Sequence, residues 1–144
     1  MADVLTISKT LSANDTGNTG GHQAGILVPK EPRILAFFPH LTGSTLNPRA
    51  HLIFLDQADQ KWEFAFIYYN NRQFGGTRNE YRLTRMTRYI REQGLIPGDE
   101  VLLACDENKR YSISSRRQKQ SKARRDAEGN VVLQLGGGWR IVEF

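Results

Sequence analysis

Hydrophobic residues gather in short runs rich in β-branched and aromatic side chains, with turn-forming residues between them, which is typical of strands. These runs predict seven strands: AGILV (24–28), HLIFL (51–55), WEFAFIYY (62–69), EVLLAC (100–105), RYSIS (110–114), VVLQL (131–135) and WRIVEF (139–144). Both alternating faces of WEFAFIYY are apolar, which indicates a strand buried on both sides. Such a strand is typical of a closed or nearly closed barrel.

Two segments between these strands predict short helices. PRILAFF (32–38) places Pro32 at the first helical position, where its missing N–H leaves no partner unsatisfied. LTRMTRYIREQG (83–94) places three apolar residues on one helical stripe, namely Leu83, Met86 and Ile90. We therefore expect a mainly β pseudobarrel of seven or eight strands, closed at its ends by two short α-helices, as one domain over residues 1–144.

Two long polar segments interrupt this pattern. LSANDTGNTGGHQAG (11–25) consists largely of glycines and small polar residues, so it cannot supply a core, and loops of this length are usually functional or disordered. NNRQFGGTRNEYR (70–82) follows the most hydrophobic predicted strand, and Tyr68 and Tyr69 beside it are expected to brace it. We interpret both segments as extensions of the barrel. A third polar segment, 116–130, predicts a mobile basic hairpin loop.

The charge of the chain is concentrated in clusters. Lys and Arg number 20 against 15 Asp and Glu, for a net charge of +5. Between residues 72 and 91 there are six arginines and one acid, Glu80, and residues 116–125 hold six Lys or Arg. Because clustered positive charge attracts phosphate backbones whereas scattered charge only solvates a surface, this distribution favours a nucleic-acid partner.

Several classes of site and location are disfavoured by the sequence. Cys105 is the single cysteine, which excludes an internal disulfide and indicates a buried structural thiol, and the three histidines lie in separate segments without ligand-like spacing. No metal site is expected. No apolar run approaches the roughly 18 residues of a membrane helix, and the first residues lack the basic and apolar start of a secretory signal. We expect a cytoplasmic protein without a membrane partner.

One carboxylate pattern favours a rival hypothesis, a self-contained Mg²⁺-dependent nuclease. Asp99 followed by Glu107-Asn108-Lys109 fits the Asp and Glu-x-Lys pattern in which two carboxylates bind the metal and the lysine assists the attacking water. However, residues 106–109 are typical of a hairpin turn between two strands, whereas the pattern requires its Glu-x-Lys on a rigid strand. We therefore expect the chain to be noncatalytic.

The segment 70–82 is rich in side chains that read base edges. Arginine donates twice to guanine, asparagine and glutamine suit adenine, and glutamate accepts from the cytosine amino group. The candidate DNA contacts here are Asn70, Arg72, Thr77, Arg78, Asn79, Glu80, Arg82 and Arg85. Three roles are open for Glu80: it contacts cytosine, it orients the arginines, or it is a surface ion-pair partner of Arg78 or Arg82.

Four motifs carry a resemblance to a known family: LSANDTGNTGGHQAG, YYNNRQFGGTRNEYRLTR, and between them Phe38-Pro39 and Leu46-Asn47-Pro48. Over about residues 7–91 the chain resembles the N-terminal effector domain of EcoRII-type restriction endonucleases. That domain is similar to the plant B-three DNA-binding pseudobarrel, whose N-arm and C-arm grip the major groove. The resemblance implies a B-three-like fold, an N-arm at about 9–23, a C-arm at about 70–82, and the target 5′-CC(A/T)GG.

The resemblance also implies site residues and partners. The implied N-arm contacts are Lys9, Ser12, Asn14, Asp15, Thr16, Thr19, His22 and Gln23. Asp15 could equally stiffen the arm as a turn residue, and His22 could hydrogen-bond the arm to itself. The expected function is sequence-specific binding of double-stranded DNA by a monomeric domain without a cofactor, with a Mg²⁺-dependent nuclease domain elsewhere in the full-length protein. A plant-type transcription-factor domain is the alternative.

Overall fold

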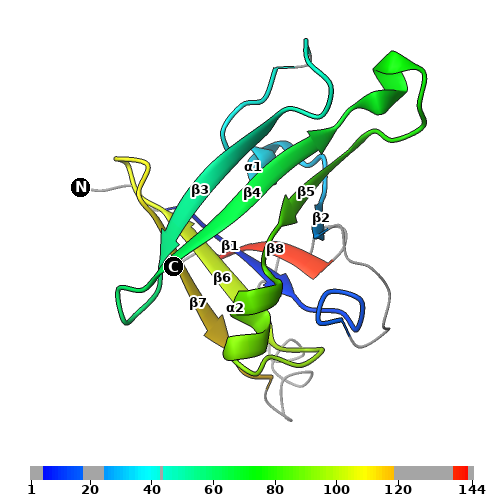
Figure 1. Ribbon diagram of the computed structural model, residues 1–144. Helices are drawn as coiled ribbons and strands as arrows, with labels where there is room; N and C mark the ends of the chain where they lie inside the picture. Colours follow the sequence, from blue (N-terminus) through cyan, green and yellow to red (C-terminus); the bar gives the residue numbers. More distant parts are fainter. Residues whose placement is uncertain (1–4, 18–24, 43, 119–137, 143–144) are drawn as a thin grey trace, which may run out of the picture.

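The computed structural model describes residues 5–17, 25–42, 44–118 and 138–142. The strands are β1 Leu5–Thr10, β2 Ile26–Val28, β3 Arg49–Leu55, β4 Lys61–Tyr69, β5 Glu80–Thr84, β6 Glu100–Cys105, β7 Tyr111–Arg116 and β8 Trp139–Val142. The helices are α1 Pro32–Leu35 and α2 Thr87–Glu92, and a 3₁₀ turn, η1, spans Asn71–Phe74 (Figure 1). The predicted mainly β fold with two short helices is confirmed.

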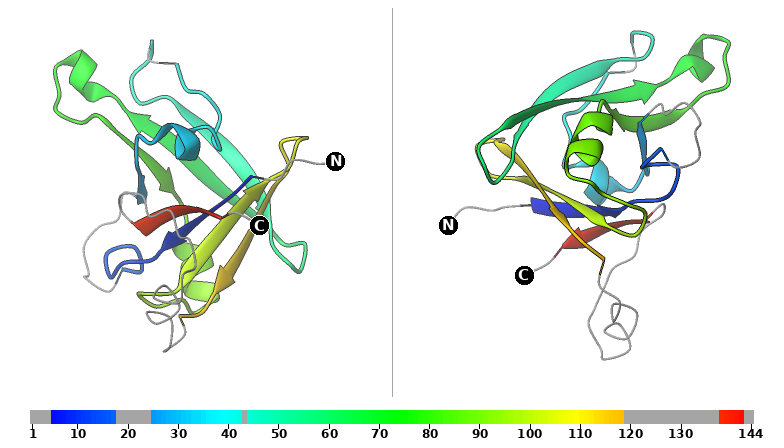
Figure 2. Two further views of the ribbon diagram at one scale, coloured as in Figure 1. Left: turned by 180° about the vertical axis from the view of Figure 1, so that it is seen from behind. Right: turned by 60° about the horizontal axis from the view of Figure 1, so that its bottom comes forward.

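The eight described strands form one sheet in the order β2-β5-β4-β3-β7-β6-β1-β8. All neighbours pair antiparallel except β3 and β7, which pair in parallel through Phe54 and Leu55. The first and last strands of this order also meet, because the Trp139 indole N–H on β8 donates to the Leu27 carbonyl on β2 at 2.8 Å. The sheet therefore curls into a nearly closed barrel (Figure 2).

Aromatic and aliphatic side chains fill the barrel, and the two helices cover its ends. The view along the barrel shows α2 in front and α1 behind it, with strands around both (Figure 2, right). Ile34 of α1 and Tyr89 of α2 are buried. Trp62 packs edge-on against Tyr89 with ring centroids 5.1 Å apart, and Trp139 is also buried. This apolar interior provides a rigid platform for the polar segments that leave it.

Two strands were absent from the sequence prediction, Leu5–Thr10 and Glu80–Thr84. The first contains buried polar side chains, Ser8 and Lys9, so its sequence lacks the apolar alternation that marks a strand. The second was assigned to a loop and the start of a helix. Its Leu83 instead pairs with Ile26 of β2 on one side and with Phe66 of β4 on the other.

Both helices are shorter than predicted. The prediction of a helix over 83–94 was wrong at its start, because Arg85 has a left-handed backbone (φ 69°) and separates strand β5 from α2. Pro32 does occupy the first turn of α1, as expected, but the helix ends at Leu35. Residues 36–38 form a turn and a bend instead of continuing the helix, and the Phe37 N–H donates to the Ile34 carbonyl at 3.1 Å.

The structure describes only part of the basic segment and of the C-terminal strands. The predicted strand 131–135 and most of the expected loop 116–130 lie outside the described residues. Arg116 belongs to β7 rather than to a loop. Cys105 is buried as expected, and burial raises the pKa of its thiol. Within the described ranges, no helix is both long and apolar enough to span a membrane.

Candidate nucleic-acid interface

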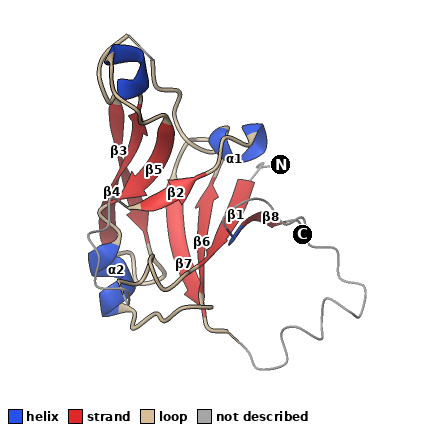
Figure 3. Cartoon of the chain, turned by 90° about the vertical axis from the view of Figure 1, so that its right-hand side faces the viewer, coloured by secondary structure: helices blue, strands red, loops and turns tan. Residues whose placement is uncertain are grey.

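The C-arm, residues 70–82, is an ordered hairpin that projects beyond the barrel between β4 and β5 (Figures 1 and 3). Its tip is closed by the Asn71 side chain, whose amide oxygen accepts from the Arg78 backbone N–H at 2.6 Å. The Arg72 N–H donates to the Arg78 carbonyl at 2.9 Å, and the Gly76 N–H donates to the Asn71 carbonyl at 2.7 Å. The arm is therefore held in shape by its own hydrogen bonds.

Glu80 lies between two arginines of the C-arm. One carboxylate oxygen, Oε2, accepts from Arg78 Nη2 at 3.0 Å and from Arg82 Nε. The hydrogen bond from Arg82 is the main reason that the pKa of Glu80 lies below its ordinary value, and the bond from Arg78 lowers it further, while partial burial opposes both. Oε1 has no partner among the described residues. The structure thus brings together three predicted site residues.

Tyr68 and Tyr69 brace the C-arm, as predicted. The Arg78 guanidinium lies over the Tyr69 ring, 3.8 Å from its centroid, which is a cation–π contact. The Tyr68 hydroxyl donates to the Asn79 amide oxygen at 2.7 Å. Arg78, Asn79 and Glu80 are each partly buried, whereas Arg72 and Thr77 are exposed. The strand-end tyrosines therefore fix the side chains that could face a ligand.

Asn70 has a structural role that the sequence did not indicate. Its side chain is completely buried, donates to the Thr45 carbonyl at 2.8 Å and accepts from the Asn47 N–H at 2.7 Å. These bonds tie the loop before β3 to the base of the C-arm. A side chain that is buried and uses its amide in this way cannot reach a base edge, so Asn70 is removed from the candidate contacts.

The described base of the N-arm, residues 11–17, is a hydrogen-bonded turn. The Ser12 N–H donates to Asp15 Oδ2 at 3.0 Å and the Asp15 N–H donates to Ser12 Oγ at 3.1 Å, which is the reciprocal pattern of a capping box. The Thr16 hydroxyl donates to the Ala13 carbonyl at 3.1 Å. Asp15 therefore acts as a turn residue, one of its two predicted roles.

Lys9 and Asp15 form a buried ion pair below this turn. The Lys9 ammonium lies 2.9 Å from Asp15 Oδ2 and donates to the Thr10 carbonyl at 2.9 Å. Both side chains are less than 10% exposed. In this arrangement the two predicted contact residues neutralise each other. Ser12 and Asn14 are exposed on the turn, while Thr19, His22 and Gln23 lie outside the described residues.

The C-arm and the described base of the N-arm, residues 11–17, lie on the same side of the barrel, with β2 between them (Figure 1). A cleft of about 560 Å³ separates them, and its walls include Asn14 of the N-arm and Arg82 of the C-arm. Arg82 also donates through Nη1 to the Gly25 carbonyl at 2.9 Å. A Cβ on Gly25 would lie 2.5 Å from the Leu83 carbonyl, and its φ is +94°, so glycine is required for this close approach.

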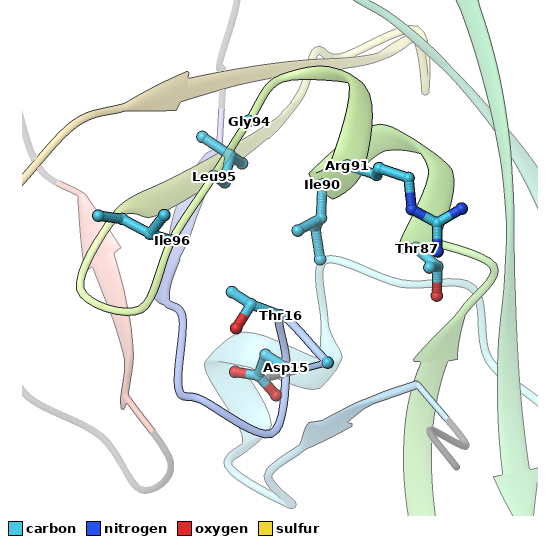
Figure 4. A pocket seen from close by; sticks show the side chains of 9 residues that line it. Asp15, Thr16, Thr87, Ile90, Arg91, Gly94, Leu95 and Ile96 are labelled. Carbon is cyan, nitrogen blue, oxygen red and sulfur yellow. The ribbon is translucent and has the colours of Figure 1, made fainter. Parts of the chain in front are cut away.

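The N-arm turn also borders α2. Asp15 and Thr16 line a second pocket of about 380 Å³, together with Thr87 and Arg91 of α2 (Figure 4). Arg88 of the same helix is exposed and donates to Glu92 at 2.6 Å. Arg85, the last predicted contact, is exposed beside α2. Of the arginines of this helix, Arg91 therefore lies next to the N-arm turn, whereas the Arg88 guanidinium lies 5.3 Å from the centroid of the Trp62 ring.

The residues of the rival nuclease pattern do not come together. Asp99 precedes β6 and Glu107 follows it, so the six residues of this strand hold them about 20 Å apart. Asp99 accepts from the backbone N–H groups of Ile96 and Gln118 at 2.9 and 2.8 Å. Lys109 lies in the predicted hairpin turn with φ 62°. Among the described residues, no three His, Cys, Asp or Glu side chains are grouped to hold a metal ion.

Comparison with known proteins places the chain in a family. The family model "Restriction endonuclease EcoRII, N-terminal" matches residues 1–96. The type II restriction enzyme EcoRII of Escherichia coli is 48% identical over 82 residues, which cover 54% of this chain and 20% of that enzyme. Auxin response factor 3 of Oryza sativa subsp. japonica is 30% identical over 116 residues, covering 79% of this chain and 14% of that protein.

A solved structure shares the fold. The protein chain of the Arabidopsis FUS3-DNA complex superposes with a TM-score of 0.59 at 20% identity, covering 78% of this chain and 96% of that chain. The predicted B-three-like pseudobarrel is therefore confirmed. The chain spans only 20% and 14% of the lengths of the two sequence relatives. From the family match and the 48% identity, the chain belongs to the EcoRII N-terminal family of restriction endonuclease domains.

Proposed function

We propose that this chain is a sequence-specific, double-stranded DNA-binding domain that serves as the target-recognition module of a type II restriction endonuclease. The observation that carries the proposal is the cluster of Arg78, Glu80 and Arg82 on an ordered arm that faces the same side as the N-arm. The proposed site is 5′-CC(A/T)GG, read in the major groove by both arms. Family membership supports the link to restriction enzymes.

The placement of Glu80 supports reading of bases rather than simple attraction to phosphates. A carboxylate near phosphates is repelled, but it accepts favourably from the cytosine amino group in the major groove. Both arginines donate to Oε2, so Oε1 is left to accept from such a group. The two guanidinium groups are partly exposed and keep further N–H donors for guanine. A cluster with this chemistry suits a C·G base pair.

The other predicted contacts on the arms include three groups. Ser12, Asn14, Arg72 and Thr77 are exposed on the arms and suit contacts to phosphates or bases. Lys9 and Asp15 form an ion pair that stabilises the turn at the base of the N-arm. Thr19, His22 and Gln23 stay proposed contacts of the N-arm.

We further propose that the chain itself does not cut DNA. In this proposal the domain binds as a monomer in the prokaryotic cytoplasm without a cofactor, and a Mg²⁺-dependent nuclease domain elsewhere in the full-length protein performs cleavage. The separation of Asp99 from Glu107 by the length of β6 supports this division. Incubated with Mg²⁺ and a plasmid that carries its site, the chain should leave the DNA intact. Cleavage that disappears in Asp99→Ala or Lys109→Ala would contradict it.

A gel-shift competition tests the binding function. A labelled duplex with 5′-CC(A/T)GG is bound by the chain and then competed with the same duplex, with each single-base variant, and with random duplex. We expect the cognate duplex to compete best, because each mismatched base pair typically costs about 1 to 3 kcal/mol. Equal competition by all duplexes would contradict sequence-specific recognition. Preference for an unrelated sequence would support a transcription-factor type of domain instead.

A further inference from the structure

We infer that Tyr68 is a positioning residue for base recognition, and that it makes Asn79 present its amide N–H donors to the DNA. The inference rests on the proposed function and adds a residue outside the arms' predicted contacts. It also changes the chemistry expected of Asn79. The partner of Asn79 becomes a hydrogen-bond acceptor on a base edge, rather than the mixed donor and acceptor edge of adenine.

A directed chain of hydrogen bonds carries the inference. Gln73 Nε2 donates to the Tyr68 hydroxyl at 3.4 Å, and this hydroxyl donates to Asn79 Oδ1 at 2.7 Å. A phenol has one proton, so the Tyr68 hydroxyl donates one bond and accepts from Gln73 with a lone pair. Asn79 Nδ2 has no partner within the described ranges. The amide therefore has its oxygen anchored in the protein and its nitrogen available.

The opposite orientation of Asn79 would need a second change in the same chain. A flipped amide would direct Nδ2 at the Tyr68 oxygen, so the phenol proton would need a new acceptor. The exposed Gln73 amide supplies one only if it turns as well and presents Oε1. The Tyr68 hydroxyl thus couples the two amides, and in the structure it donates to Asn79 Oδ1.

Tyr68 can impose this orientation because its ring is held by a stack that begins in the core. Phe38 stacks on Phe66 with centroids 4.3 Å apart, and Phe66 stacks on Tyr81 at 5.5 Å. Tyr81 stacks on Tyr68 at 4.4 Å, with the ring planes 11° apart. The hydroxyl at the end of this stack is a fixed point at the base of the C-arm. Groups fixed before binding lose less entropy when the ligand arrives.

The orientation of the amide decides which base edges suit it. Adenine is read by an amide that donates to N7 and accepts from the N6 amino group. Tyr68 holds one lone pair of Asn79 Oδ1, so the group with its full hydrogen-bonding capacity left for the DNA is Nδ2. Its N–H bonds suit guanine N7 and O6, or thymine O4. We therefore expect Asn79 to contact a base whose major-groove edge offers hydrogen-bond acceptors, namely guanine or thymine.

Three variants and one matched control test the inference by the ratio of affinities for cognate and singly substituted duplexes. Tyr68→Phe removes the hydroxyl and keeps the stacked ring. Tyr111→Phe is the matched control, because it removes a hydroxyl on β7 and keeps a ring that packs against Phe54. We expect Tyr68→Phe to lower the ratio about 2- to 10-fold, the range of one hydrogen bond. Tyr111→Phe should leave it unchanged. A merely structural Tyr68 would lower the melting temperature without changing the ratio.

Asn79 variants show whether Tyr68 acts through this residue. In an Asn79→Ala background, Tyr68→Phe should change the ratio no further, because the positioned group is absent. Asn79→Asp keeps an acceptor for Tyr68 and replaces the N–H donors by an oxygen. We expect Asn79→Asp to lose at least as much of the ratio as Asn79→Ala. Its added negative charge acts on random duplexes too, so the ratio isolates the loss of the donors.

Two results would overturn the inference while leaving the proposed function intact. The first is an unchanged ratio in Tyr68→Phe with clear sequence preference in the wild-type chain. The second is a ratio retained by Asn79→Asp but lost in Asn79→Ala, because an acceptor would then be the group in use. A wild-type chain without preference for any duplex would overturn the proposed function, and this inference with it.

Discussion

Charged side chains on both arms are paired within the protein. Lys9 is neutralised by Asp15, and Glu80 is shared by Arg78 and Arg82. Such pairing fixes the rotamers of long side chains before a ligand arrives, which reduces the entropy lost on binding. It also lowers the net positive potential of each arm. The arms therefore suit geometric reading of bases better than general attraction to phosphates.

Replacing Glu80 separates the preference for the cognate sequence from the general affinity for DNA. We expect Glu80→Ala to lose about 1 to 3 kcal/mol of preference for the cognate cytosine, the scale of one good base contact. Binding to random DNA should hold steady or tighten, because the variant removes a negative charge beside phosphates. Affinities for cognate, singly substituted and random duplexes measure both effects.

Glu63→Ala is the matched control for this variant. Glu63 is an exposed acid on β4 that faces His51 at 3.2 Å, outside the C-arm. Its removal changes the net charge equally and should leave the preference as it is. If Glu80→Ala and Glu63→Ala keep the same cognate-to-variant ratio, Glu80 is an ion-pair partner only.

Site residues could be predicted by type more easily than by role. The sequence indicated base-reading chemistry in the C-arm because Arg78, Glu80 and Arg82 alternate along one short segment. It could not indicate that Asn70 is buried, since the partners of its amide are 23 and 25 residues away along the chain. Lys9 was predicted to be a contact because the resemblance implied it, and its burial beside the nearby Asp15 appears only in the fold.

At the scale of elements, one buried carboxylate joins four strands. Glu100 of β6 accepts from Ser8 of β1 at 3.0 Å, from Arg116 of β7 at 3.0 Å, and from Arg140 of β8 at 2.6 Å. This network lies on the β1-β6-β7-β8 half of the sheet. It explains how strands with polar residues inside the fold remain stable, because each buried polar group has a partner.

We predict that this network makes stability depend on pH. Burial raises the pKa of Glu100, but the hydrogen bonds and charges of Arg140 and Arg116 outweigh it, so the pKa falls below its ordinary 4.5. A carboxyl with a pKa lowered by folding stabilises fully above its ordinary pKa, and the effect is lost as pH falls through the folded value. Glu100→Gln should cost about 3 kcal/mol near neutral pH, as when one partner of a buried ion pair is removed.

Urea unfolding at pH 7 and at pH 4 or below checks this prediction. The difference in unfolding free energy between wild type and Glu100→Gln should be largest near pH 7 and should shrink below pH 4.5. Glu107→Gln, in the exposed turn after β6, makes the same change of charge and should cost less than about 0.5 kcal/mol. A difference that stays constant with pH would mean that Glu100 is not ionised in the folded chain.

The elements themselves were predictable where apolar residues mark them. The strand prediction was close for β3, β4 and β6, whose buried residues are mostly apolar. It failed for β1, where Ser8 is buried against the distant Glu100 and Lys9 is buried against Asp15 of the following turn. It failed for β5 because Leu83 fits a helical stripe as well as a strand, and only pairing across the sheet decides between them.

For the whole molecule, the barrel anchors both arms on neighbouring strands, which supports the proposal that they bind one ligand. The Trp139 contact brings β8 to β2, and β2 pairs with β5 of the C-arm hairpin. The N-arm returns to the sheet through Gly25, immediately before β2. Both arms are thus anchored on adjacent strands of one rigid body. Arg85, which is exposed after β5, and Arg91, which lines the pocket beside Asp15, extend this face.

We predict a steep dependence of DNA affinity on salt. The slope of log affinity against log salt should be about −0.9 for each phosphate neutralised. Arg85→Ala and Arg91→Ala should each weaken cognate and random duplexes alike and reduce the magnitude of the slope by about 0.9, the value of one phosphate contact. Arg110→Ala is the matched control, because Arg110 lies in the turn between β6 and β7, away from both arms (Figure 1). A flat salt dependence would show that the arginines serve another partner.

Chemical protection of the DNA tests the central claim, that the two arms read bases of 5′-CC(A/T)GG in the major groove. Dimethyl sulfate methylates guanine at N7 in the major groove and adenine at N3 in the minor groove. We predict that saturating amounts of the chain protect the guanine N7 atoms of both strands within the site, because the C-arm arginines donate to that edge. Guanine N7 atoms that react as in the unbound duplex, or protection confined to adenine N3, would contradict the account.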